Sequence, residues 1–179
     1  SGATLLNACQ PEHAKRRKVA YLLGTFPQLT TTFIDREILE AKRVGADLLL
    51  LAIRRPKPFV MKPEVEALAR ETRYLLPASP LLFIIANLSF GLLHFWRYFT
   101  TLLYLLTRRH RTLRERLRTL LHFGEGVWAA YLLRTSGVQH IHAHFADRAA
   151  TVALVAAKLL NVSYSLTAHA NDIYVAPSL

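Results

Sequence analysis

Cysteine is nearly absent from this sequence, which has one, Cys9, among 179 residues. A single cysteine cannot form an internal disulfide, so cysteine usage leaves the redox compartment open and is most typical of the reducing cytoplasm. The N-terminal region also lacks an apolar segment behind its charges, so no signal peptide is recognisable. We expect a cytoplasmic protein with an unstructured leader over residues 1–17 and a single domain over 18–179.

Acidic residues are also few. Lys and Arg outnumber Asp and Glu by 23 to 12, which gives a formal net charge of +11. Such a chain attracts anionic partners, among which are membrane lipids, sugar phosphates and nucleic acids. Helix-turn-helix patterns, zinc-finger spacings and aromatic RNA-binding signatures are missing, and the arginines stand beside leucines and not among stacking aromatics. We therefore expect no nucleic-acid partner.

Several catalytic motifs are missing too. The sequence has no G-x-x-x-x-G-K-[ST] and no G-x-G-x-x-G, so a nucleotide site built by this chain alone is not predicted. No serine stands in a nucleophile elbow, and no cysteine lies near a histidine. His142 and His144 have only Asp147 and Asp172 as nearby carboxylates, which are too few converging ligands for zinc. We expect neither a metal nor another cofactor.

What the sequence does contain is the pattern of an α/β domain. Hydrophobic residues make up 52% of it. Continuous apolar runs at 19–23 and 47–53 predict buried strands, and a helical spacing of apolar residues over 34–41 separates them. A helix over 64–71 and a short strand over 73–76 are predicted to follow. This order favours an α/β domain of three layers, with helices on both faces of a mostly parallel sheet.

Polar residues follow the first predicted strand. Gly24 ends the strand, and Thr30, Thr31 and Thr32 stand just before the helical pattern. Thr32 and Asp35 have the spacing of a capping box. In one interpretation the threonines only cap the helix, and in the other they and the helix N-terminus hold phosphate or sugar oxygens. The two roles are compatible.

A second pattern of strand, helix and strand ends the chain. Residues 138–141 are predicted to form a strand and 148–160 a helix with Asp147 as its N-cap. A turn with His142 and His144 follows the first strand, and His169 and Asp172 follow a strand over 163–167. Because the carboxyl ends of parallel strands meet at one edge of a sheet, the polar turns are expected to line one pocket. Each histidine has a structural role as its alternative, above all His142, whereas His169 is the first candidate for function.

The most apolar stretch of the chain is 81–106, which is long enough to cross a bilayer. His94 and Arg97 lie near its middle and Gly91 interrupts it, and these features argue against a spanning helix. A buried helix or helical hairpin is one alternative. A surface helix that enters a membrane interface is the other.

An arginine-rich segment follows the apolar stretch. Leucines at helical spacing predict an amphipathic helix that continues to Gly137. Each cationic side chain near anionic headgroups adds roughly 1 kcal/mol to binding, so we expect peripheral association with the inner face of the plasma membrane; a solvated face is the alternative. This apolar and basic helical insertion spans about 80–120, and its membrane-facing residues are Arg108, Arg109, Arg111, Arg114 and Arg118.

Three segments of the sequence resemble a known family. FPQLTTTF at 26–33, IHAHFAD at 141–147 and SLTAHANDIY at 165–174 are similar to the N-terminal half of family 4 glycosyltransferases, particularly the bacterial enzymes that assemble exopolysaccharide, capsule or lipid-linked sugars. The pair HAHF and TAHxxDIY, in this order and spacing, is its most specific part. The resemblance covers roughly residues 18–179.

The resemblance implies a GT-B architecture, in which two Rossmann-like domains face a cleft and a sugar passes from a nucleotide-sugar to an acceptor with retention of configuration. This chain would be the acceptor-side domain, which binds a glycan or lipid-linked acceptor. His169 would be the catalytic residue beside the transferred sugar. The other residues that the resemblance implicates in substrate binding are Gly24, Thr30, Thr31, Thr32, His144 and Asp172.

Two features depart from the family pattern. Relatives often have Ser-Glu-Thr where this chain has three threonines, so a carboxylate is missing. The sequence also stops before the donor-binding domain with its Glu-x7-Glu motif, so we expect this chain to be inactive without that C-terminal domain as a partner. The alternative is a non-catalytic module that recruits a separate donor domain or binds an anionic membrane.

Overall fold

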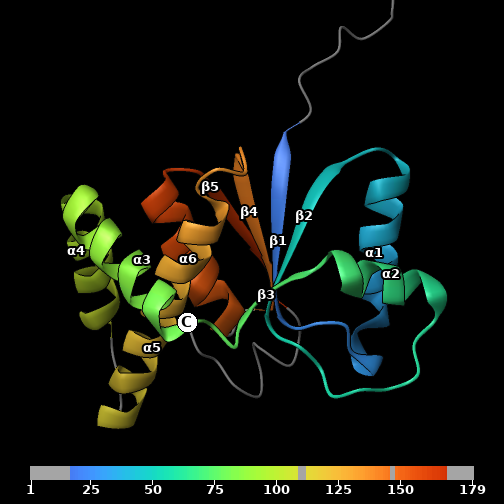
Figure 1. Cartoon of the computed structure of the whole chain (residues 1–179), viewed down its shortest axis with the longest axis horizontal. Helices are drawn as coiled ribbons and strands as arrows, with labels where there is room; N and C mark the ends of the chain where they lie inside the picture. Colours follow the sequence, from blue (N-terminus) through green and yellow to red (C-terminus); the bar gives the residue numbers. More distant parts are fainter. Residues whose placement is uncertain (1–16, 109–111, 146–147, 169–179) are drawn as a thin grey trace, which may run out of the picture.

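The structure is a computed structural model that describes residues 17–108, 112–145 and 148–168. A five-stranded parallel sheet with the order β3-β2-β1-β4-β5 forms its centre (Figure 1). The strands are β1 (Lys18–Thr25), β2 (Asp47–Arg54), β3 (Arg73–Leu76), β4 (His140–His144) and β5 (Ser163–Thr167). The predicted α/β class with a parallel sheet is therefore confirmed.

Helices cover the sheet from two sides in a Rossmann-like, three-layer arrangement (Figure 1). One side carries α1 (Thr32–Arg43), preceded by the short 3-10 helix η1 (Leu29–Thr31), and α2 (Pro63–Glu71). The other side carries α5 (Leu113–Leu133) and α6 (Arg148–Leu160). Outside these two lie α3 (Pro80–Leu93) and α4 (Phe95–Leu106), which pack on α5 and α6.

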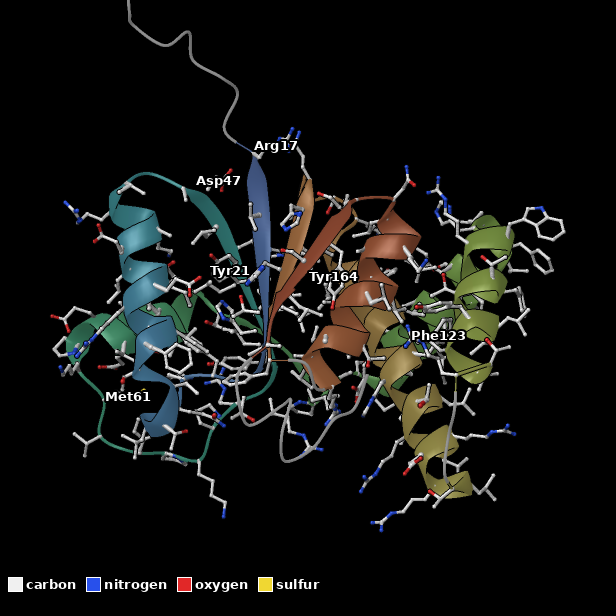
Figure 2. All side chains as sticks on the ribbon, turned by 180° about the vertical axis from the view of Figure 1, so that it is seen from behind. Arg17, Tyr21, Asp47, Met61, Phe123 and Tyr164 are labelled. Atoms are coloured by element: carbon white, nitrogen blue, oxygen red, sulfur yellow. The ribbon has the colours of Figure 1, made fainter. Side chains whose placement is uncertain are left out.

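Strand β1 lies at the centre because its side chains are apolar toward both layers. Ala20 and Leu22 are fully buried in the cluster that includes α5 and α6, whereas Leu23 belongs to the cluster around Ile34 and Ile38 of α1. Tyr21 also points to the α1 side, as Figure 2 shows. Because every strand runs parallel to β1, all five end at the same edge of the sheet.

Helices α5 and α6 approach closely through small residues. A Cβ atom added to Gly126 would lie 2.4 Å from the Cβ of Val155. On α6 a stripe of alanines is buried, among them Ala149, Ala153 and Ala156. The indole of Trp128 donates a hydrogen bond of 3.1 Å to the Leu75 carbonyl, which ties α5 to β3. These contacts hold α5 close to α6 and attach α5 to the sheet.

The start of α1 corrects one prediction. Thr31 is the N-cap residue and Thr32 is already helical, and no side-chain oxygen caps the helix. The Thr31 hydroxyl instead donates to the Gln28 carbonyl at 3.4 Å. The capping box of Thr32 and Asp35 is therefore wrong, because η1 shifts the start of the helix and Asp35 is buried.

Strand β4 corrects another prediction. It runs from His140 to His144, so His142 and His144 belong to the strand and not to a turn after it. The predicted strand over 138–141 begins and ends too early, because histidines at alternate positions have the polarity of a loop. Further along, the prediction of β5 at 163–167 is confirmed.

The apolar stretch 81–106 forms two helices and not one. Within the described ranges no single helix is long and apolar enough to cross a membrane, and α3 and α4 pass such a test only as a pair bent by 108°. Helix α5 ends at Leu133, somewhat before the expected stop at Gly137, which takes a φ of 73° in the following turn. The resulting helical insertion lies at the end of the molecule farthest from α1 and α2 (Figure 1).

Candidate functional site

A pocket of about 220 Å³ opens at the edge where the parallel strands end. The end of β1 supplies Gly24 and Thr25, and the end of β2 supplies Arg54. Phe145 and Arg148, which follow β4, complete the lining together with Gln28. The pocket therefore lies at the switch point between β1 and β4, where the connections leave the sheet in opposite directions and where open α/β sheets bind their ligands.

Two hydrogen bonds to the backbone of Phe26 fix the loop after β1. The Phe26 amide donates to the Arg54 carbonyl at 3.4 Å, and the Tyr74 hydroxyl donates to the Phe26 carbonyl at 3.1 Å. Phe26 itself is buried. The guanidinium of Arg55 lies 4.4 Å from the centre of the Tyr74 ring, a cation–π contact. The pocket wall formed by this loop is thus held in place by β2 and β3.

Two arginines give the pocket its charge. Arg148 donates through Nε to Glu125 Oε2 at 2.7 Å and through Nη2 to Glu125 Oε1, so α5 holds this guanidinium in a bidentate pair. Arg54 takes part in no ion pair among the described residues. The Glu125 carboxylate balances Arg148, and Arg54 is left as the cation that an anionic ligand would meet.

Phe145 has an unusual backbone conformation at the same edge. Its φ is 72°, which a bulky side chain rarely adopts. Its amide donates to the Thr167 carbonyl at 2.9 Å, and its ring meets Phe33 edge-on at 6.4 Å between centroids. Such backbone strain costs about 1–3 kcal/mol and is concentrated at functional sites. It places the Phe145 ring in the pocket wall beside α1.

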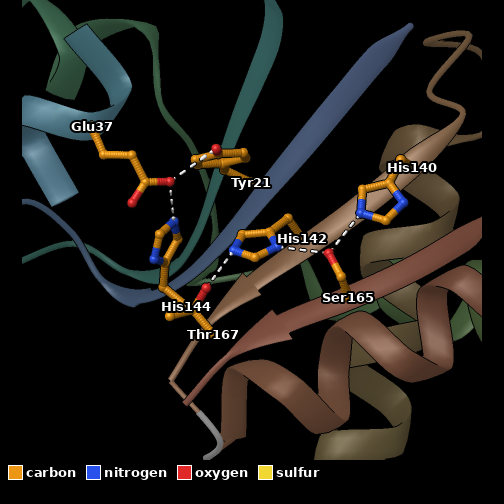
Figure 3. Close-up of polar contacts among 7 residues, drawn as sticks. All are labelled: Tyr21, Glu37, His140, His142, His144, Ser165 and Thr167. Carbon is orange, nitrogen blue, oxygen red and sulfur yellow. Dashed lines mark hydrogen bonds and ion pairs between the residues drawn. The ribbon is translucent and has the colours of Figure 1, made fainter. Parts of the chain in front are cut away.

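A row of polar side chains runs along the sheet on the α1 side (Figure 3). Its β4 members are His140, His142 and His144, which share a face because they occupy alternate positions. Ser165 Oγ lies 2.7 Å from His140 Nε2 and 2.7 Å from His142 Nδ1. The other ring nitrogen of His142 lies 3.1 Å from Thr167 Oγ1. Every ring nitrogen of His142 therefore has a hydroxyl partner.

The protonation of this row follows from its surroundings. Burial lowers the pKa of His142; the Glu37 carboxylate opposes this shift and His140 adds to it. Burial, helped by a hydrogen bond to Glu37 and by its charge, raises the pKa of Tyr21 to about 12. A neutral imidazole donates through one nitrogen and accepts through the other, which suits the two hydroxyls beside His142. At neutral pH the row is a hydrogen-bonding array without charge on His142 or Tyr21.

His144 lies at the meeting point of the row and α1. It is 1% exposed, and its Nε2 lies 3.6 Å from Glu37 Oε1. The same Glu37 oxygen accepts a hydrogen bond of 3.0 Å from the Tyr21 hydroxyl. The His144 ring also meets the Tyr21 ring at 5.1 Å. His144 is thus packed between β1 and α1 and is not among the residues that line the pocket.

The structure brings together only part of the predicted site. Gly24 lines the pocket. The three threonines do not line it, although their neighbours Gln28 and Ile34 do. Thr30 and Thr32 are exposed, and Thr31 is buried. His169 and Asp172 lie outside the described residues, as do Arg109, Arg111 and Asp147. Arg108, Arg114 and Arg118 are exposed on or beside the outer helices.

Sequence reasoning did not select Arg54 or Arg148 for the pocket. Both carry a visible signal, because Arg54 ends a buried strand and Arg148 begins the helix that follows β4. A cation at the carboxyl end of a strand is well placed for a ligand site. Among the described residues no group of three or more His, Cys, Asp and Glu side chains is placed to hold a metal ion.

Comparison with known proteins adds no relative. No family model, no curated protein and no solved structure matches the chain. The resemblance to family 4 glycosyltransferases therefore depends on the three sequence segments, of which the described residues include the first completely and the other two in part.

Proposed function

We propose that this chain is the acceptor-side domain of a retaining glycosyltransferase, which transfers sugar from a nucleotide-sugar to a glycan or lipid-linked acceptor. The observation that carries the proposal is the pocket at the switch point between β1 and β4, lined by Gly24, Thr25, Gln28, Arg54 and Arg148. Hydroxyl, amide and guanidinium groups are suited to sugar hydroxyls and phosphates. The sheet order and the resemblance in 26–33, 141–147 and 165–174 support the same function.

In this proposal the domain binds and orients its substrate. Arg54 is the group that faces a phosphate, because Glu125 already balances the charge of Arg148. A departing diphosphate needs preorganised cations or amide donors around it, and one wall of a cleft supplies only some of them. The donor-binding domain supplies the remainder, so this chain alone binds without turnover.

The first experiment measures anion binding to this chain. We expect pyrophosphate to shift the backbone amide resonances of Gly24, Thr25 and Arg54 in NMR titrations. Arg54→Gln removes a charge-assisted hydrogen bond and should weaken pyrophosphate binding by about tenfold. Arg36→Gln, on the exposed surface of α1, removes the same charge and should leave the affinity unchanged. An equal loss of pyrophosphate affinity in the two variants would mean that the anion binds only by non-specific electrostatic attraction.

The second experiment tests catalysis in a protein that joins this domain to its donor-binding domain. His169→Ala is expected to lower the turnover number at least about tenfold, the low end of what a general acid–base group contributes. Sugar transfer to a lipid-linked acceptor and circular dichroism of the variant are measured together. Full activity in the correctly folded variant would contradict the role of His169.

The alternative is a non-catalytic module that recruits a separate donor domain or binds a membrane surface. The same transfer assay separates the two functions. Pyrophosphate binding at Arg54 with no sugar transfer from any nucleotide-sugar, in the presence of a donor domain, favours the module. Transfer that depends on both domains favours the enzyme.

A further inference from the structure

The corner between α3 and α4 exposes large apolar side chains. Leu92 and Leu93 end α3 and are 79% and 78% exposed, and Trp96 at the start of α4 is 78% exposed. Phe95 beside it is half exposed. The helices meet here at 108°, so these neighbours project from a convex corner. Apolar side chains clustered in this way mark an interaction surface.

The first half of α5 adds a second exposed apolar stripe. Leu113, Leu117 and Leu121 lie four residues apart on one face of the helix, a spacing typical of a buried face, and all three are exposed. Arginines alternate with them on the same turns. From residue 77 to 124 the sequence contains seven arginines and a single acidic residue, Glu115. With α3 and α4 this half helix forms the end of the molecule opposite α1 and α2, which we call the outer flank (Figures 1 and 2).

A groove of about 400 Å³ lies next to the corner, between α4, the end of α6 and β5. Its lining includes Arg97, Thr100, Lys158, Asn161 and Tyr164 and, among the described residues, no acidic side chain. Lys158 Nζ also lies 5.1 Å from the centre of the Tyr104 ring. Arg97 directly follows Trp96, so cationic groups stand where the apolar corner ends. This succession of apolar and then cationic groups matches the depth profile of a lipid leaflet.

We propose that the outer flank binds an anionic lipid leaflet, with the α3–α4 corner among the acyl chains and Arg97 and Lys158 around a lipid phosphate. A second copy of this chain is a poorer occupant, because two surfaces with the same positive charge repel each other. Lipid phosphates instead supply the opposite charge over the whole flank. The proposal is independent of the glycosyltransferase assignment, since it uses no residue of the pocket.

Vesicle flotation tests the corner. The purified protein should float with vesicles of phosphatidylcholine and phosphatidylglycerol and stay behind with phosphatidylcholine alone. Leu92→Glu combined with Trp96→Glu should weaken binding about tenfold or more, because charged groups are costly among acyl chains. Val44→Glu combined with Val60→Glu adds the same two charges and is the matched control, since Val44 at the end of α1 is 67% exposed and Val60 in the loop before α2 is 94% exposed. Equal binding of the double variant and the control would overturn the proposal.

Tryptophan fluorescence reports the depth of the corner. The protein has two tryptophans, of which Trp128 is buried and hydrogen-bonded to Leu75. A blue shift on adding anionic vesicles, together with quenching by brominated lipids, should therefore come from Trp96 and disappear in Trp96→Phe. Flotation without any shift or quenching of Trp96 would refute insertion of the corner.

The groove is tested by charge removal. Arg97→Gln with Lys158→Gln should weaken binding to anionic vesicles roughly 30-fold. Arg36→Gln with Lys62→Gln removes the same charge at exposed positions on the α1 side and should have little effect. Inorganic phosphate at constant ionic strength should not displace the vesicles, and displacement would show a site for free phosphate instead. Self-association that the Leu92 and Trp96 changes abolish in the absence of lipid would show a second copy as the occupant.

Discussion

The two halves of α5 differ in where their apolar residues lie. Leu113, Leu117 and Leu121 in the first half are exposed, whereas the second half is buried from Phe123 to Ala130. The second half contains Gly124, Gly126 and alanines, which allow α6 and α3 to approach, and the first half combines leucines with arginines. Apolar content alone therefore does not determine burial. The size of the neighbouring side chains and their charge determine whether another helix can cover them.

The largest expected effect compares two leucines of α5. Leu133→Ala should lower the free energy of unfolding by about 3 kcal/mol, because Leu133 is buried and its loss leaves a cavity. Leu117→Ala should change it by less than about 0.5 kcal/mol, since Leu117 is exposed. Urea unfolding followed by circular dichroism measures both. Similar losses would mean that the first half of α5 is covered in the folded protein.

A second comparison makes the same change at two helical glycines. Gly126→Ala should destabilise the fold by about 2 kcal/mol, because the new Cβ would meet Val155. Gly91→Ala, on α3 of the outer flank, places the new Cβ within 4 Å of nothing beyond the adjacent backbone of its own helix and should stabilise the fold by about 0.5 kcal/mol. Thermal unfolding of the two variants is the measurement. A stable Gly126→Ala protein would contradict the close packing of α5 on α6.

Two ion pairs provide a third comparison. Glu125→Gln leaves the partly buried Arg148 without its carboxylate and should cost about 1.5 kcal/mol. Glu40→Gln breaks the exposed pair with Arg43 and should leave the stability almost unchanged. Unfolding in low and high salt separates the two, because salt screens only the exposed pair effectively. Equal salt dependence would mean that Arg148 is solvated in the pocket.

The smallest expected effect concerns Asp35. Burial raises the pKa of its carboxyl above the ordinary 3.8, and its Oδ1 has no hydrogen-bond partner among the described residues. The folded state then holds the proton more tightly than the unfolded state, so stability falls as the pH rises from 3.8 through the raised pKa and stays lower above it. Asp35→Asn should be more stable than wild type at pH 7 by about 1 kcal/mol and should lose this pH dependence.

Unfolding titrations between pH 4 and pH 8 check this prediction. The difference in stability between the two proteins should shrink toward the acidic end, because burial favours the protonated form of the Asp35 carboxyl. A less stable Asp35→Asn protein at pH 7 would mean that the carboxylate has a favourable partner.

The strands of the sheet were the most predictable part of the fold. Continuous apolar runs identify β1 and β2 because both faces of a central parallel strand are buried. The bounds of β3 and β5 were predicted as the structure has them. His140, His142 and His144 also alternate with apolar residues, which is a pattern typical of a strand. Three histidines are polar enough to indicate a loop, and only the structure shows that Ser165 and Thr167 on β5 provide hydrogen-bond partners for the first two.

The pocket and the α3–α4 corner were less predictable than the strands. Arg54 and Arg148 come together only through the order of the strands, which places the ends of β2 and β4 on either side of β1. No proline marks the break between α3 and α4 at His94, so the sequence does not predict its position. The angle between the two helices depends on how they pack on their neighbours. Tertiary contacts, and not local propensity, fix both features.

The length of α5 has one more consequence. Its 21 residues form a rod of about 31 Å. One end carries the exposed leucines and arginines, and Glu125, which holds the pocket guanidinium of Arg148, lies past its middle. Because the helix is continuous from the exposed leucines to Glu125, a shift of the outer flank along the axis of α5 would also move the Glu125 carboxylate and, through Arg148, one side of the pocket.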